Sequence, residues 1–109
     1  MTIDIITVVP DLLEGPFSQS IMKRAQDKGL LTVRTHNLRK WAINRHAQVD
    51  DYPFGGGAGM VLMCEPLANA FEELQRNTTY DAIIYMTPDG KTFDQPMANQ
   101  LSMEQNLLI

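Results

Sequence analysis

The sequence predicts an α/β fold in which a parallel sheet is flanked by helices. Two observations support this prediction. Four short apolar runs, rich in β-branched residues at the start of the chain, occupy residues 3–9, 30–35, 81–86 and 106–109. Helical patterns lie between them, and a helical crossover is the usual connection between parallel strands. The chain has 109 residues, which is enough for one domain or for part of a larger one.

The first half of the chain supplies two of the strands. Residues 3–9 form an almost continuous apolar run, which indicates a strand buried on both faces. A helical turn starts at Asp11, and we expect a Gly-Pro pair to stop it. Ser18 is the expected N-cap of a second helix, which should end at Gly29. Residues 30–35 return to strand character.

The second half continues the alternation. Residues 65–76 place apolar side chains on one helical face, and residues 81–86 form a short apolar run. Asp94 is the expected cap of a helix over 94–103. Residues 106–109 read as the opening of a further strand, and the apolar pattern is still open at Ile109. We therefore expect residues 1–109 to be the N-terminal part of a larger domain.

Charge and composition exclude several classes of protein. The formal net charge is −4, yet seven basic residues lie between positions 23 and 45 against one acid, Asp27. Such a basic segment suits contact with a polyanion, although it is also compatible with a merely solvated face. A single cysteine, Cys64, excludes an internal disulfide and is expected to be buried. The acidic start and the lack of a long apolar run predict a cytoplasmic protein without a membrane partner.

Residues 37–60 lose all regular periodicity and contain the densest motif. Glycines at 55, 56, 57 and 59 permit positive φ and allow close approach of an anion or a flat base. The motif is neither a P-loop nor a dinucleotide fingerprint, and a flexible turn is the alternative interpretation. Because the segment also contains Trp41, Val49, Tyr52, Phe54 and Met60, we expect it to be ordered.

Other polar residues near this motif are candidates for binding. Arg45 can hold a phosphate or stack on a base, and His46 can donate a hydrogen bond. Asp50 and Asp51 are adjacent, so their side chains should point to opposite faces, and a turn-capping role is expected for at least one. No spacing of His, Cys and acids predicts a metal site.

A second candidate site follows the apolar run at 81–86. Ligands bind at the carboxyl ends of strands in open α/β sheets, and residues 85–89 occupy that place. Thr87 and the backbone around Pro88 offer hydrogen bonds, while Tyr85 and Met86 offer apolar contact. An ordinary Pro-Asp-Gly turn is the alternative interpretation.

These two stretches, 45–60 and 85–95, resemble the bacterial tRNA (guanine-N1)-methyltransferase family, and the resemblance covers all 109 residues. It implies a SPOUT-type α/β fold with a trefoil knot, a homodimer, and S-adenosylmethionine as methyl donor. The implied reaction is methylation of N1 of the guanine just after the anticodon of tRNA. The knot, the aspartate that serves as general base and a C-terminal tRNA-binding domain are all expected beyond Ile109. Residues 1–109 alone are therefore expected to be inactive.

The resemblance also implies roles for individual residues. The methyl donor would contact Tyr85, Met86, Thr87, Pro88 and Asp89. The tRNA anticodon stem-loop would contact Arg45, His46, Asp50, Gly55, Gly56, Gly57 and Gly59. Two interpretations from other classes stay open on the residues alone: a non-catalytic RNA-binding module and a flavodoxin-like domain that binds a small ligand.

Overall fold

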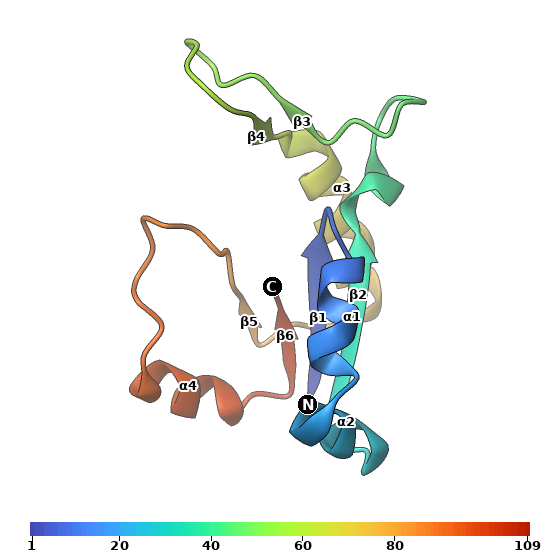
Figure 1. Cartoon of the computed structure of the whole chain (residues 1–109), viewed down its shortest axis with the longest axis vertical. Coiled ribbons are helices and arrows are strands. Elements are labelled where there is room, and N and C mark those ends of the chain that lie inside the picture. The colour runs from blue at the N-terminus through green and yellow to red at the C-terminus, as the bar shows by residue number, and fades with distance from the viewer.

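The computed structural model describes all 109 residues, which form a four-stranded sheet, a separate hairpin and helices (Figure 1). The sheet contains β1 (Thr2–Thr7), β2 (Thr32–Asn37), β5 (Ala82–Ile83) and β6 (Asn106–Leu108), in the order β2-β1-β6-β5. Every neighbouring pair is parallel, as the sequence predicts. The helices are α1 (Asp11–Phe17), α2 (Ser20–Asp27), the 3-10 helix η1 (Leu38–Trp41), α3 (Cys64–Asn77) and α4 (Gln95–Ser102). Strands β3 (Asp50–Asp51) and β4 (Val61–Leu62) pair antiparallel.

The strand register defines two chemically different faces of the sheet. Ile3 is aligned with Val33 and Leu107 on the neighbouring strands, and Asp4 is aligned with Arg34. Side chains alternate along a strand, and aligned residues share a face. Ile3, Val33 and Leu107 therefore lie on one face of the sheet, and Asp4 and Arg34 lie on the other. We call these the Ile3 face and the Asp4 face.

The Asp4 face carries the small hydrophobic core. Leu38, Val49 and Ala70 are buried there, with Ile6 and Leu67 among the side chains packed against them. Helix α3 supplies Ala70 and packs on η1, so the predicted helix at 65–76 is confirmed. Two of the three core residues come from the aperiodic segment 37–60, which shows that this part of the segment is ordered, as expected.

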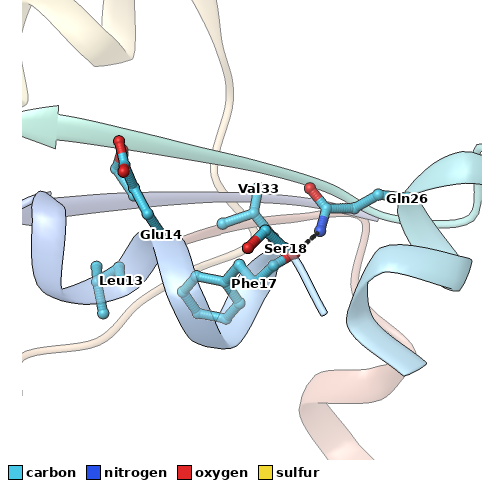
Figure 2. Close-up of a pocket in the computed structure, with 7 residues that line it drawn as sticks. Leu13, Glu14, Phe17, Ser18, Gln26 and Val33 are labelled. Atoms are coloured by element: carbon cyan, nitrogen blue, oxygen red, sulfur yellow. Dashed lines mark hydrogen bonds between the residues drawn. The ribbon is translucent and has the colours of Figure 1, made fainter. Parts of the chain in front are cut away.

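Helices α1 and α2 lie on the Ile3 face over β2, and a hollow of about 370 Å³ separates them from the strand (Figure 2). Leu13, Phe17 and Val33 contribute apolar surface to this hollow. Gln26 Nε2 donates to the carbonyl oxygen of Phe17 at 2.6 Å and to that of Met22 at 3.1 Å. This side chain therefore ties α2 to the end of α1.

Two helix boundaries differ from the sequence prediction. Gly15 and Pro16 do not stop the first helix before them: α1 includes both residues and ends at Phe17, one residue after the proline. Ser18 does not cap α2. Its N–H donates to Glu14 O at 3.0 Å and its hydroxyl to Gly15 O at 3.2 Å, so it closes α1 instead.

Two other caps agree with the sequence prediction. Gly29 ends α2 with φ of +71°. Its N–H donates to Gln26 O, and the N–H of Leu30 donates to Ala25 O, which is the Schellman arrangement. At the start of α4, Asp94 Oδ1 accepts from Met97 N at 3.0 Å, as expected for a cap.

Three strands are shorter than predicted, and the strand predicted at 30–35 lies two residues later, at Thr32–Asn37. In the run at 3–9 the strand ends at Thr7. The hydroxyl of Thr7 accepts a hydrogen bond from the N–H of Val9 at 3.1 Å, and the chain turns there. The run at 81–86 pairs only over Ala82–Ile83, with a further bond from Ile84 N to Leu108 O. Burial of β1 on both faces is a wrong prediction: its one fully buried residue is the acid Asp4.

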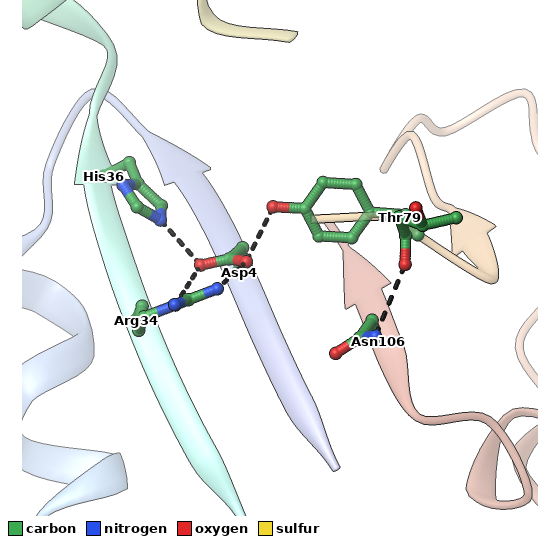
Figure 3. A network of polar contacts seen from close by, with 6 residues as sticks. Asp4, Arg34, His36, Thr79 and Asn106 are labelled. Atoms are coloured by element: carbon green, nitrogen blue, oxygen red, sulfur yellow. Dashed lines mark hydrogen bonds and ion pairs between the residues drawn. The ribbon is translucent and has the colours of Figure 1, made fainter. Parts of the chain in front are cut away.

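The buried carboxylate of Asp4 is fully hydrogen-bonded (Figure 3). Arg34 donates from Nε to Oδ1 and from Nη2 to Oδ2, each at 2.7 Å. His36 Nε2 lies 2.7 Å from Oδ1, and the hydroxyl of Tyr80 donates to Oδ2 at 2.7 Å. Burial alone would raise the pKa of Asp4, but hydrogen bonds from Arg34, His36 and Tyr80 outweigh it and lower the pKa to about 2. Burial and the bond to Asp4 raise the pKa of Tyr80 to about 12.

The Asp4 network predicts a specific loss of stability in acid. Because the pKa of Asp4 falls from 3.8 to about 2 on folding, the stabilisation is present above pH 3.8 and is lost as the pH falls towards 2. We expect this carboxylate to account for about 2 kcal/mol of the free energy of unfolding. Urea unfolding of the wild type and Asp4→Asn at several pH values measures it. In the variant, the free energy of unfolding should lack this part of its dependence on pH. Equal pH dependence in both proteins would contradict the assignment.

Candidate functional site

The largest hollow of the molecule is a cleft of about 930 Å³ on the Ile3 face. Its wall follows the segment 84–93 and α4, which arch away from β5 and β6 in Figure 1. Most of the surface is apolar, supplied by Met1, Ile3, Ile84, Tyr85, Met86, Pro88, Phe93, Met97, Ala98, Leu101, Leu107 and Ile109. A cleft of this size and polarity is typical of small-molecule sites.

The segment after β5 contains the predicted ligand loop. Tyr85, Met86, Thr87 and Pro88 line the cleft, whereas Asp89 is absent from its lining. The loop closes in a tight turn, because Gly90 N donates to Thr87 O at 3.2 Å. A Cβ added at Gly90 would lie 3.2 Å from Thr87 Cγ2 and 3.3 Å from Thr87 O, so a side chain there would fit only if Thr87 moved by a few tenths of an ångström.

The glycine motif forms the exposed tip between β3 and β4. Gly55, Gly56, Gly57 and Gly59 all have positive φ, between +85° and +113°, and an added Cβ at any of them would meet no atom within 4 Å. The tip is therefore open to approach, as the glycines predict.

The aromatic side chains beside the glycines do not pack on the core. Tyr52 is 77% exposed, and Phe54 is fully exposed. They are exposed because the hairpin of the two-residue strands β3 and β4 extends away from the core (Figure 1). Asp51 Oδ1 accepts from Tyr52 N at 2.7 Å, which gives it the expected local capping role.

Arg45 and His46 lie exposed on a separate ordered turn. The turn closes where Ala47 N donates to Asn44 O at 3.2 Å, and Asn44 Oδ1 accepts from Gln48 N at 3.0 Å. Arg39 Nη1 donates to the carbonyl oxygen of Ala47 at 2.9 Å and holds the turn from η1. Ala47 has φ of +54°, an uncommon value for a residue with a side chain. Arg45 and His46 therefore sit on a turn that is held in place by hydrogen bonds.

The structure separates groups that the sequence places together. The η1–β3 segment, which carries Arg45, and the β3–β4 tip project in different directions from one end of the molecule (Figure 1). Helix α2, which carries Lys23 and Arg24, lies at the opposite end. Lys23 pairs with Asp27 at 3.6 Å, and Arg34 is engaged by Asp4. The basic window at 23–45 is therefore no continuous surface.

Cys64 is exposed, not buried as predicted. It occupies the first position of α3, which buries Pro66 and Ala70 on its inner side. No group of three or more His, Cys, Asp or Glu side chains is placed to hold a metal ion. No helix is long and apolar enough to cross a bilayer.

Comparison with known proteins decides the family. The sequence profile described as tRNA (Guanine-1)-methyltransferase TrmD matches residues 1–109. The chain belongs to the TrmD family. It is 56% identical over 109 residues to the tRNA (guanine-N(1)-)-methyltransferase of Flavobacterium johnsoniae and 54% identical to that of Bacteroides thetaiotaomicron. In both comparisons all of this chain is matched, but it spans only 48% of the relative's length.

The fold of the family is also matched. A crystal structure of tRNA (m1G37) methyltransferase from Aquifex aeolicus superposes with a TM-score of 0.87 at 29% identity. The match covers 99% of this chain and 49% of that one. The prediction of a parallel sheet flanked by helices, as in this part of a TrmD protein, is confirmed.

The turn at Gly90 predicts a local response to substitution in this TrmD chain. Gly90→Ala should displace the Thr87 side of the turn. The resonance shifts in the amide spectrum should be concentrated at residues 85–93. The free energy of unfolding should fall by about 1 kcal/mol or less. Gly15→Ala is the matched control, because an added Cβ there meets no atom within 4 Å and its φ is not positive. Unchanged resonances at 85–93 in Gly90→Ala would contradict the close packing.

Proposed function

We propose that the full-length protein transfers a methyl group from S-adenosylmethionine to N1 of the guanine just after the anticodon of tRNA. The observation that carries this proposal is the apolar cleft of about 930 Å³, bordered by the loop that resembles the family's donor loop. Membership of the TrmD family supports the reaction class. The chain spans about half the length of its relatives, so the activity belongs to the longer protein.

The cleft fits the proposed methyl donor chemically. Its volume falls within the roughly 300–1,000 Å³ of typical ligand pockets, and its apolar lining suits the adenine ring. Thr87 and the backbone around Pro88 supply hydrogen-bonding groups beside Tyr85 and Met86. Asp89 acts through the turn, where its N–H donates to Thr87 Oγ1 at 3.4 Å.

On the RNA side, the proposed contacts come from two exposed structures. Arg45 and His46 donate to backbone phosphates of the anticodon stem-loop from their fixed turn. Glycines 55, 56, 57 and 59 admit a splayed-out base without obstruction by side chains, and Asp50 lies at the foot of that hairpin. Because the two structures diverge, the RNA has to span both.

The reaction makes one bond and breaks one. Guanine N1 attacks the sulfonium methyl in line, the N1–C bond forms, the S–C bond breaks, and the N1 proton goes to a general base. No covalent enzyme intermediate is needed, so an activated Cys or Ser has no role. We place the base, the trefoil knot and the tRNA-binding domain in the longer protein beyond residue 109, and we propose a cytoplasmic homodimer.

A direct assay tests the proposal against its two rivals. Full-length protein is incubated with a tRNA transcript and methyl-labelled S-adenosylmethionine, and a second transcript replaces the target guanine with adenine. Label should enter only the first transcript. Binding of tRNA without transfer would identify an RNA-binding module instead, and binding of a small ligand without any tRNA affinity would identify the flavodoxin-like alternative.

The cationic turn predicts a salt-dependent contact. Arg45→Ala in the full-length protein should weaken tRNA binding and lower the slope of log affinity against log salt by about one. Affinity for the methyl donor should stay unchanged, because Arg45 lies outside the cleft. Binding titrations at several salt concentrations measure this, and a wild-type slope combined with a lowered melting temperature would contradict the contact.

The glycine tip predicts a different response. Gly57→Val places a β-branched side chain at φ of +113°, where it opposes the backbone conformation and blocks close approach. Single-turnover methyl transfer should fall more than tRNA affinity. If transfer and melting temperature fall together, the tip only supports the fold.

A further inference from the structure

The lining of the 930 Å³ cleft contains a single charged side chain, Lys91. The other lining residues are apolar or uncharged polar residues, and Asp89, the nearest acid in sequence, is not among them. The ion pairs of the molecule join Lys23 to Asp27, Arg34 and His36 to Asp4, and Arg76 to Glu72. Lys91 has no carboxylate within 4 Å, so its positive charge is uncompensated.

The fold brings this charge to the cleft directly after a constrained turn. The turn from Thr87 to Gly90 is closed by the bond from Gly90 N to Thr87 O and is tightly packed at Gly90, and Lys91 is the next residue. Phe93, farther along the same wall, and Leu101 of α4 line the cleft as well. A bound ligand would displace water from this apolar surface, and a charge interaction with Lys91 would then be screened less than on an open surface.

The N-terminal ammonium of Met1, which also lines the cleft, donates to Leu30 O at 3.2 Å. Lys91 is thus the one cationic side chain in the cleft that can orient a charged ligand. A negatively charged group is attracted to Lys91, and positively charged groups are repelled. S-adenosylmethionine carries one negative group, the α-carboxylate, together with a positive ammonium and a positive sulfonium. Its carboxylate is therefore the one group of the donor that Lys91 attracts by opposite charge.

We propose that Lys91 binds the α-carboxylate of the methyl donor and so fixes which way the donor lies in the cleft. This inference rests on the proposed function and adds a residue to it. The adenosine end then lies on the apolar surface of Ile3, Leu107 and α4, away from the lysine. Lys91 is a binding residue that orients the donor, and it takes no part in bond formation.

Calorimetry on the full-length protein tests the assignment with two ligands that differ by one group. S-adenosylmethionine carries the carboxylate, and decarboxylated S-adenosylmethionine lacks it. Lys91→Met should weaken binding of the first about five- to tenfold. Binding of the second should be unchanged or tighter, because the variant removes a repulsion. Lys91→Arg keeps the charge and should bind the first ligand within about twofold of wild type.

A matched control removes a lysine elsewhere. Lys28 is exposed after α2 and outside the cleft, so Lys28→Met should change neither affinity. Equal weakening of both ligands by Lys91→Met would overturn the inference, because it would mean that Lys91 only supports the loop. A second result would also overturn it: Lys91→Met leaves the binding of both ligands unchanged but lowers the slope of log tRNA affinity against log salt. That result would assign Lys91 to a phosphate of the tRNA. If folded wild-type protein binds no S-adenosylmethionine, the proposed function itself fails.

Discussion

The arrangement of the sheet depends on one buried carboxylate. Asp4 lies on β1, between β2 and β6, and is fully buried. It accepts hydrogen bonds from Arg34 and His36 of β2 and from Tyr80, which precedes β5. A buried charge without such partners would cost several kcal/mol, so the network holds these segments in one arrangement. Ile3, the neighbour of Asp4, points to the other face and lines the cleft, so a shift of β1 by one residue would disrupt both faces at once.

The candidate site is divided among three parts of the molecule that differ in their support. The cleft rests on the sheet and on α4, and its loop is closed by a turn at Gly90. The turn that carries Arg45 is held by a hydrogen bond from Arg39. The glycine tip, in contrast, extends from a hairpin of two-residue strands and leaves Phe54 fully exposed. The function that we propose assigns the cleft to a small donor and the two projections to RNA.

Much of the fold follows from local patterns, because apolar runs and caps act over a few residues. The four parallel strands, the Gly29 and Asp94 caps and the presence of a loop after the strand at 81–86 were all predictable in this way. The Asp4 network was not, because its partners lie 30, 32 and 76 residues away and only the register aligns them. For the same reason the sequence suggested one basic surface, whereas the fold separates α2 from the turn of Arg45. The one signal of this network in the sequence was an acid within an apolar strand, because a buried acid requires a partner.

The proposal that the cleft on the Ile3 face receives the methyl donor is tested most directly by a crystal structure of the full-length protein with S-adenosylmethionine. We expect density for the donor between residues 84–93 and α4, in contact with Tyr85 and Pro88. Donor density at any other place, with this cleft filled by protein side chains, would contradict it.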